Sequence, residues 1–161
     1  MTNDPEVKKI GERMRLIALG TVLGQSGKFD GAIKALKEAI KISPDAMEAY
    51  IPLAMAYRGK NMLDEALEIL HQVEEKKISN SEDPSVMDFD LYFTFATIYV
   101  RKDDRPNAVK YAKKAIKAND NPVTKKEIDE AIKFGVINSG EPDRTPMIEG
   151  LRELIKEYEE E

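Results

Sequence analysis

The sequence contains neither cysteine nor tryptophan, and His71 is its single histidine. Without cysteine the chain cannot form a disulfide, a thiol nucleophile or a cysteine-ligated metal site. Aromatic residues make up 7% of the chain, which leaves few rings on which bases could stack. No run approaches the roughly 18 consecutive apolar residues that a membrane helix needs, so we expect no membrane insertion. The lack of cysteine suits a reducing compartment, and we expect the protein to be cytoplasmic.

Charged and aliphatic residues occur here in the proportions of a soluble, helix-rich protein. The chain has 161 residues, of which 42% are hydrophobic and 34% are charged. This length is enough for one domain with a buried core, and we expect a single domain over residues 1–161. The formal net charge is −5, which argues against nucleic acid as the main partner.

Small residues recur along the chain at a fixed spacing. Gly20 is followed 12 residues later by Ala32 and 7 residues later still by Ala39. Small side chains at a helix crossing let two backbones approach closely, whereas larger ones would push them apart. The spacing therefore predicts three copies of one helix–turn–helix unit. The same 12-then-7 pattern returns at Ala54, Ala66 and Val73, and at Ala96, Ala108 and Ala115.

Capping and turn residues predict where these helices begin and end. Asp4-Pro5 is a helix start, because Asp caps well and Pro suits the first helical position. Pro52 should bend its helix or shift its start, since it lacks an N–H and crowds the preceding turn. Residues 77–83 are expected to form an exposed loop. The expected helices are 5–25, 29–42, 47–60, 63–76, one through Tyr92 to Tyr99, one from Pro106 to Ile116, a capping helix at about 124–138 and a last helix at about 145–160.

This pattern resembles the tetratricopeptide repeat family, a helix–turn–helix unit of 34 residues. The expected repeats are about 13–46, 47–80 and 89–122. The chain departs from the family pattern at Ile78, where the closing Pro is usual, and at Arg105 and Ala112. Other solenoids of helical hairpins are the main competing fold. The matching residues are Leu16, Leu19, Gly20, Leu23, Gly27, Phe29, Ala32, Leu36, Ala39 and Pro44, then Tyr50, Leu53, Ala54, Tyr57, Leu63, Ala66, Leu70 and Val73, then Tyr92, Phe95, Ala96, Tyr99, Ala108 and Ala115.

The resemblance implies an all-α fold, an α-solenoid that winds as a right-handed superhelix with C-terminal capping helices. It also implies that a peptide or helix of a partner protein binds in the concave groove lined by the first helix of each unit. In one subclass of the family, Lys, Asn, Asn, Lys and Arg clamp a chaperone's C-terminal carboxylate. The matching positions here are Ile17, Thr21, Pro52, Asp90 and Thr94, and none of them fits, so we expect no such clamp. The groove positions are Met14, Ile17, Thr21, Gln25, Glu48, Ile51, Met55, Arg58, Asp90, Phe93, Thr97, Val100 and Arg101.

This groove is mainly apolar, with Arg58 and Arg101 toward one rim. Met and Phe make adaptable contacts of the kind that accept an amphipathic helix or a hydrophobic peptide. The alternative is that Ile17, Ile51 and Phe93 pack against one another or against the C-terminal helix. Both interpretations stay open from the sequence.

Residues that could carry chemistry are few. Glu68, His71 and Glu75 share a helix face, but a metal site also needs ligands from other segments. Ser26 has no histidine suited to act as its base, and no Gly-rich phosphate loop is present. We therefore expect no enzyme, no cofactor and no metal. A basic stripe on the second helix of the third unit is interpreted as a solvated face or as a dock for an acidic partner, such as the chain's own Glu-rich tail: Lys110, Lys113, Lys114 and Lys117.

The last expected helix has one apolar side that must pack somewhere. It could cap its own solenoid, fill its own groove or exchange with a second copy, which leaves monomer and dimer open. The sequence favours a non-catalytic adaptor or scaffold that binds a protein or peptide partner. A small secretion-type or assembly chaperone and a self-associating scaffold are the alternatives. A metal protein or enzyme is a remote one. The apolar residues of the last helix are Ile148, Leu151, Leu154, Ile155 and Tyr158.

Overall fold

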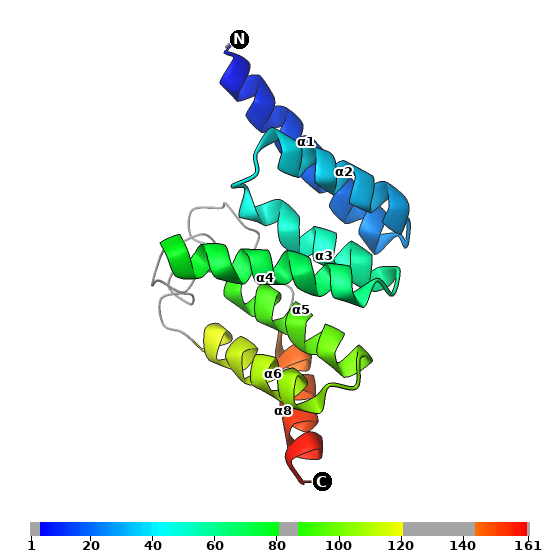
Figure 1. Cartoon of the computed structure of the whole chain (residues 1–161), viewed down its shortest axis with the longest axis vertical. Helices are drawn as coiled ribbons and strands as arrows, with labels where there is room; N and C mark the ends of the chain where they lie inside the picture. Colours follow the sequence, from blue (N-terminus) through cyan, green and yellow to red (C-terminus); the bar gives the residue numbers. More distant parts are fainter. Residues whose placement is uncertain (1–3, 81–86, 121–143, 161) are drawn as a thin grey trace. The chain divides into compact units, whose positions relative to one another are not determined.

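The computed structural model describes residues 4–80, 87–120 and 144–160. These residues are mainly helical, and no strand occurs among them (Figure 1). The all-α prediction is confirmed. The chain divides into two compact units, Met1–Ser79 and Asn80–Glu161, each of which has its own packing. The right-handed superhelix implied by the resemblance stays a prediction.

Unit 1 contains four α-helices and a 3-10 turn. They are α1 (Pro5–Gln25), α2 (Phe29–Ile42), η1 (Met47–Ala49), α3 (Tyr50–Gly59) and α4 (Leu63–Asn80). The side chain of Asp4 caps α1 by accepting a hydrogen bond from the Glu6 backbone N–H at 2.9 Å. The capping pattern therefore located this helix start correctly, because the cap acts through neighbours in the chain.

Pro52 shifts the start of its helix, as its chemistry predicts. The segment begins with the 3-10 turn η1, and the α-helical geometry of α3 starts at Tyr50. Pro52 thus occupies the first turn of α3, where a helix leaves its N–H groups without intrahelical partners. The missing N–H costs no helical hydrogen bond there.

The second helix of the second repeat is longer than expected. We placed its end at Lys76 and an exposed loop from Lys77, but α4 continues to Asn80. The prediction of a loop at 77–80 is therefore wrong. The family's closing proline is replaced by Ile78, so no residue in this stretch lacks the N–H that the helix needs.

The three turns between paired helices share one backbone conformation. Gly27, Asn61 and Asp103 have positive φ angles of 75°, 62° and 56°. In each turn the residue that follows donates its N–H to a carbonyl five residues back: Lys28 to Leu23 at 2.8 Å, Met62 to Tyr57 at 2.9 Å, and Asp104 to Tyr99 at 3.0 Å. This is the bond of a left-handed helix C-cap. The shared turn supports three copies of one structural unit.

Packing in unit 1 depends on glycine at two helix crossings. A Cβ atom placed on Gly20 of α1 would lie 2.5 Å from Cγ of Leu36 in α2, which is 0% exposed. A Cβ on Gly59 of α3 would overlap the ring of Phe29 in α2. Gly20 belongs to the predicted set of small residues, whereas Gly59 was not singled out from the sequence. Because neither position carries a side chain, α2 can pack closely against both α1 and α3.

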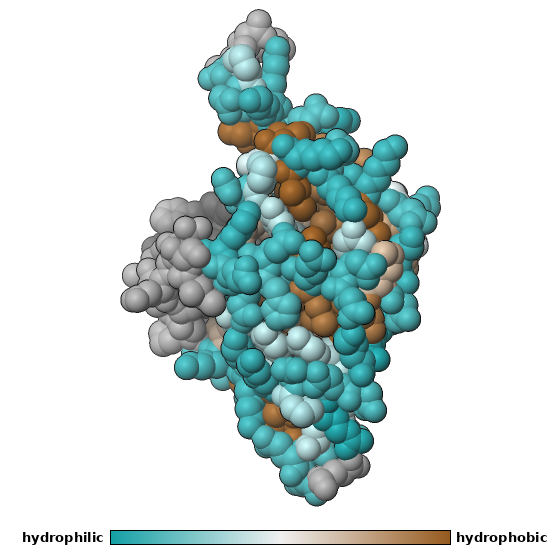
Figure 2. Space-filling view, viewed as in Figure 1, coloured by the Kyte–Doolittle hydropathy of each residue, from teal (hydrophilic) through white to brown (hydrophobic). Residues whose placement is uncertain are grey.

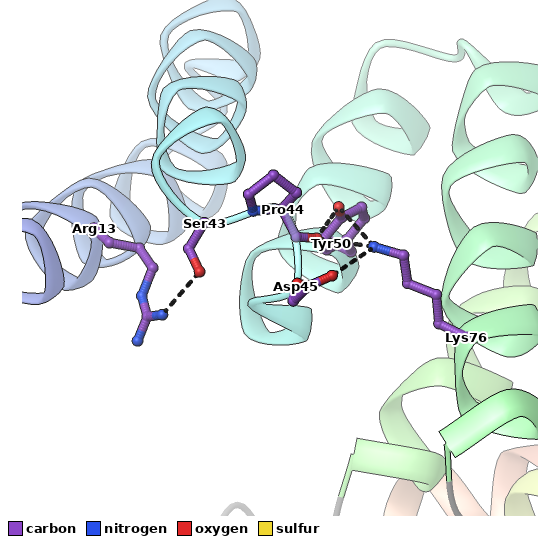
Figure 3. Close-up of polar contacts among 6 residues, drawn as sticks. All are labelled: Arg13, Ser43, Pro44, Asp45, Tyr50 and Lys76. Carbon is purple, nitrogen blue, oxygen red and sulfur yellow. Dashed lines mark hydrogen bonds and ion pairs between the residues drawn. The ribbon is translucent and has the colours of Figure 1, made fainter.

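Polar contacts tie the connection after α2 to the helices around it (Figure 3). The Tyr50 hydroxyl donates to the carbonyl of Pro44 at 2.5 Å, and Lys76 Nζ donates to the same carbonyl at 2.9 Å. Lys76 also lies 3.7 Å from an Asp45 carboxylate oxygen and over the Tyr50 ring. The end of α2, the start of α3 and the last turns of α4 therefore share one network.

Unit 2 contains α5 (Met87–Arg101), α6 (Arg105–Asn119) and α8 (Thr145–Glu160). The antiparallel pair α5 and α6 encloses stacked rings: Phe95 and Tyr111 have centroids 4.2 Å apart, and Tyr99 and Tyr111 have centroids 5.5 Å apart. Helix α8 packs against α6 with Leu151 buried. The expected capping helix at about 124–138 lies outside the described residues.

Candidate functional site

The groove positions of unit 1 lie on α1 and α3, which pack against each other. On α1, Met14 is 61% exposed, Ile17 and Thr21 are half-buried, and Gln25 is exposed. On α3, Ile51 is 6% exposed and Met55 is 45% exposed, while Arg58 is half-buried. The two methionines are therefore exposed to solvent. Ile17 and Ile51 are more buried and also contribute to packing. The surface made by these seven residues is called the α1–α3 surface below.

The groove positions of unit 2 lie along α5. Phe93 is half-buried and stacks on Phe89 with 5.7 Å between ring centroids. Thr97 is half-buried, Val100 is 36% exposed and Arg101 is exposed. This face of α5 therefore carries an aromatic ring, two β-branched side chains and a cation.

Threonine hydroxyls on these faces are engaged by their own helices. Thr21 donates to the carbonyl of Ile17 at 2.9 Å, and Thr97 donates to the carbonyl of Thr94 at 2.9 Å. A hydroxyl that bonds back to the helix leaves its methyl group for contact with a neighbour. Both positions therefore present more apolar surface than their residue type suggests.

Arg13 supports the rim of the α1–α3 surface and was not identified from the sequence. Its Nη2 lies 3.3 Å from the Glu48 carboxylate, and its Nη1 donates to the Ser43 hydroxyl at 3.4 Å. The side chain is 20% exposed, and its buried Nε has no hydrogen-bond partner among the residues that the structure describes. Glu48 was expected to line the groove, but here its carboxylate is shared with an arginine of the same unit. The partners are 30 and 35 residues away, so no local sequence pattern could reveal the contact.

The positions that correspond to a carboxylate clamp make other contacts. Thr94 is buried and donates to the carbonyl of Asp90 at 2.7 Å. The Asp90 carboxylate lies 3.5 Å from Nη2 of Arg144. In unit 1, Ile17 and Pro52 carry no polar side-chain group. Apolar contact is therefore the chemistry of Ile17 and Pro52, whereas Asp90 forms an ion pair with Arg144 within unit 2.

Glu68, His71 and Glu75, which the sequence puts on one helix face, all belong to α4. His71 Nδ1 lies 3.6 Å from a carboxylate oxygen of Glu74, a residue outside the candidate set of Glu68 and Glu75. Over residues 4–80, 87–120 and 144–160, no group of three or more His, Cys, Asp or Glu side chains could hold a metal ion. No helix in this part of the chain is long and apolar enough to cross a membrane.

The basic stripe on α6 takes part in holding α8. Lys113 Nζ lies 2.5 Å from the Glu159 carboxylate of α8, and Arg105 at the start of α6 lies over the Tyr158 ring at 5.0 Å. Lys114 lies instead over the rings of Tyr92 and Tyr111, both at 5.0 Å. The stripe is thus divided between an acidic helix of the same chain and the aromatic core of unit 2.

Comparison with known proteins agrees with the repeat geometry. Two family models described as tetratricopeptide repeat match the chain, one over residues 25–77 and the other over residues 89–122. A search of curated proteins finds no match. Repeats of this family generally mediate protein–protein interaction, and proteins built from them are typically non-catalytic adaptors. Together the two matches cover more than half of the chain, which therefore belongs to the tetratricopeptide repeat family.

Proposed function

We propose that the chain is a non-catalytic adaptor whose first helices bind a peptide or helix of a partner protein. The observation that carries this proposal is the pair of exposed methionines on the α1–α3 surface. Met14 is 61% exposed and Met55 is 45% exposed, on two helices that pack side by side. Apolar side chains held at a surface by a rigid scaffold favour a protein partner, and flexible thioethers adapt to the shape of an apolar ligand.

The polar groups around this surface support an apolar ligand over a charged peptide end. Arg13 and Glu48 neutralise each other at 3.3 Å, and the Thr21 hydroxyl bonds to its own helix. Recognition would then depend on side-chain contact with an amphipathic helix or hydrophobic peptide. The proposed binding residues are Met14, Ile17, Thr21, Gln25, Ile51, Met55 and Arg58 in unit 1, and Phe93, Thr97, Val100 and Arg101 in unit 2.

A second candidate function is a self-associating scaffold or assembly chaperone that uses α8. The supporting observation is that Leu151 is the one residue of α8 that is fully buried, while Met147 is 41% exposed. A helix held by so small a core could leave α6 and bind the same face of a second copy. The contacts from Lys113 to Glu159 and from Arg105 to Tyr158 favour the capping arrangement instead.

The adaptor proposal is tested by charged substitutions at two groove positions, the exposed Met55 and the half-buried Phe93. Met55→Glu and Phe93→Glu, singly and together, should reduce binding of interacting proteins recovered by pull-down with the wild-type chain. Leu19→Glu is the control, because Leu19 is 48% exposed on α1 and lies outside the proposed surface. Circular dichroism should show unchanged helix content in all variants. Retention of the same partners by the double variant would contradict binding at the groove positions.

A further inference from the structure

Arg144 lies immediately before α8, and its side chain reaches α5. Its carbonyl accepts the first hydrogen bond of α8, from the Ile148 N–H at 2.9 Å. Its guanidinium carbon lies 4.6 Å from the centre of the Phe89 ring, and its Nη2 lies 3.5 Å from the Asp90 carboxylate. The side chain is 14% exposed, although arginine side chains are mostly exposed in proteins. The start of α5 therefore holds this guanidinium largely out of water.

The contact combines two groups that suit a guanidinium. A planar cation over the face of an aromatic ring is attracted by the ring's π electrons, and a carboxylate beside it adds an ion pair. Phe89 is 1% exposed and stacks on Phe93 with 5.7 Å between centroids, so its ring is held in place. Asp90 lies in the first turn of the same helix. Both groups belong to α5 itself and would remain there if Arg144 left.

This contact lies on the face of α5 that carries the groove positions of unit 2. Asp90 is one of these positions, and Phe93 is another. Phe93 stacks on the same ring that Arg144 covers. A partner that lay along this face would therefore meet Arg144 at the first turn of α5.

The helix that follows Arg144 is held on unit 2 by few buried groups. Leu151 is the one buried residue in the whole of α8, all of which the structure describes. Near its C-terminal end, α8 contacts α6 through an exposed ion pair between Glu159 and Lys113 at 2.5 Å. This end, marked C in Figure 1, is mostly hydrophilic in Figure 2. Exposed ion pairs contribute little to stability, so a ligand that binds the same site can displace this segment.

We infer that the first turn of α5 is a binding site for an arginine side chain of a partner protein, and that Arg144 fills this site from within the chain until a partner displaces it. The inference rests on the proposed function, since it takes the α5 face as a partner surface and names its ligand chemistry and its regulation. Because the occupant belongs to the same chain, it competes at a high effective concentration. A partner must therefore add contacts of its own to those of its arginine, and the neighbouring groove position Phe93 offers one.

The test uses the full chain with Arg144→Gln and Leu151→Asp, which together empty the site and release α8. The probe is a fluorescent peptide of residues 144–160, acetylated so that no terminal charge stands beside its arginine. Fluorescence anisotropy should show that it binds this double variant at least about tenfold more tightly than the wild-type chain, whose own segment occupies the site. Adding Asp90→Asn should weaken binding about tenfold, because the guanidinium loses its counter-charge. Equal affinities for the wild-type chain and the double variant would overturn occupancy by Arg144.

Substitutions in the peptide separate the guanidinium from the rest of the helix. Arg144→Gln in the peptide should weaken binding about tenfold, and Arg144→Lys should weaken it severalfold, because an ammonium lacks the planar face that stacks on the ring. Arg152→Gln is the matched control, since it removes the same charge from an exposed position of α8. Its affinity should equal that of the unsubstituted peptide. Equal affinities of the Arg144→Gln and Arg152→Gln peptides would overturn the arginine site.

A second measurement uses the wild-type chain and does not depend on the folding of the double variant. In a protein prepared with isotope-labelled arginine, the side-chain Nε–H signal that Arg144→Gln removes from the NMR spectrum belongs to Arg144. An excess of the unlabelled peptide should move this signal to the position of an exposed arginine. The Arg144→Gln peptide at the same concentration should leave it in place. A signal that already has the position of an exposed arginine in the free chain would overturn occupancy by Arg144.

Other outcomes separate this inference from the proposed function. If the peptide binds as expected and Met55→Glu leaves partner binding intact, the α5 site is supported without the α1–α3 surface. If Met55→Glu abolishes partner binding and the peptide does not depend on Arg144, the α1–α3 surface stands and the arginine site is overturned. A wild-type dimer in analytical ultracentrifugation that Arg144→Gln dissociates would also overturn the inference, because the occupant would then be Arg144 of a second copy.

Discussion

Gly20 of α1 lies directly under the side chain of Leu36 of α2. A Cβ atom on Gly20 would come within 2.5 Å of Leu36 Cγ and within 3.0 and 3.1 Å of its two methyl carbons. Leu36 is fully buried and is bounded by other core residues, so it cannot move aside without opening a gap. The close approach of α1 and α2 therefore depends on the absence of a side chain at position 20.

Gly20→Ala is expected to destabilise unit 1 by about 1–3 kcal/mol, the usual cost of overpacking a core. Gly11→Ala is the matched control, since a Cβ there meets nothing within 4 Å. Because alanine is the better helix former, Gly11→Ala should stabilise the helix by about 0.5–1 kcal/mol. Urea unfolding followed by circular dichroism measures both changes. Equal effects of the two substitutions would contradict the crossing geometry.

Local signals in the sequence predicted much of this fold. Asp4 and Gly27 act on backbone groups a few residues away, so their chemistry can be recognised without knowing the fold. The repeated spacing of small residues located the helix crossings for a similar reason, since it follows from helix geometry. The end of α4 was missed because Ser79 and Asn80 usually suit turns, although the helix continues through them.

The features of the candidate site that were not predicted from the sequence depend on contacts between residues far apart in the chain. The role of Arg13 follows from Glu48 and Ser43, and that of Gly59 follows from Phe29, none of which is a sequence neighbour. Val7 and Ile10 of α1 are ordinary core residues by type, yet they are 49% and 47% exposed. Sequence patterns identify which face of a helix is apolar, but another element decides whether that face is covered.

Substitutions at the turn positions Gly27 and Asp103, which both have positive φ angles, should affect stability differently. Gly27 tolerates its φ of 75° without a steric cost, whereas Asp103 adopts a φ of 56° with a side chain present. Gly27→Ala should therefore destabilise unit 1 by about 1–2 kcal/mol. Asp103→Gly should leave the stability of unit 2 unchanged or slightly higher. Thermal unfolding of the two variants measures this, and a loss of stability in Asp103→Gly would show that its side chain stabilises the turn.

Tyr50 and Lys76 should be energetically coupled through the Pro44 carbonyl. Tyr50→Phe removes the hydroxyl that donates at 2.5 Å but leaves the lysine bond at 2.9 Å, so the cost should be about 0.5–1.5 kcal/mol. Lys76→Met keeps the length of the side chain and removes its donor. In the double variant the Pro44 carbonyl loses both donors, and the loss should exceed the sum of the single losses. A double-mutant cycle from urea unfolding measures the coupling, and strict additivity would contradict a shared acceptor.

The carboxylate of Asp104 makes the stability of α6 depend on pH. A hydrogen bond from the Asn107 side chain at 2.8 Å, helped by one from the Asn107 backbone at 3.2 Å, holds the pKa of Asp104 below its ordinary value. A lowered pKa in the folded state contributes stability above the pKa of the unfolded chain, and this contribution disappears as the pH falls through the folded-state pKa. The cap should therefore weaken in acid, below the ordinary range for aspartate.

Asp104→Asn isolates this effect, because asparagine keeps a capping oxygen and does not titrate. Urea unfolding monitored from neutral pH down through the carboxylate range should give a shallower acid slope for the variant than for wild type. At neutral pH the two proteins should differ little, since both retain an acceptor for the Asn107 N–H. Identical slopes would show that other carboxylates dominate the acid response.

Leu151 should decide whether α8 stays on α6. It is 4% exposed, whereas Met147, one turn earlier on the same helix, is 41% exposed. Leu151→Asp places a charge in the α6 contact and should release α8, with loss of helix content and of stability in unit 2. Met147→Asp should change neither property. Light scattering separates the two arrangements of α8: a cap gives a monomer before and after the substitution, whereas a helix exchanged between copies gives a wild-type dimer that Leu151→Asp dissociates.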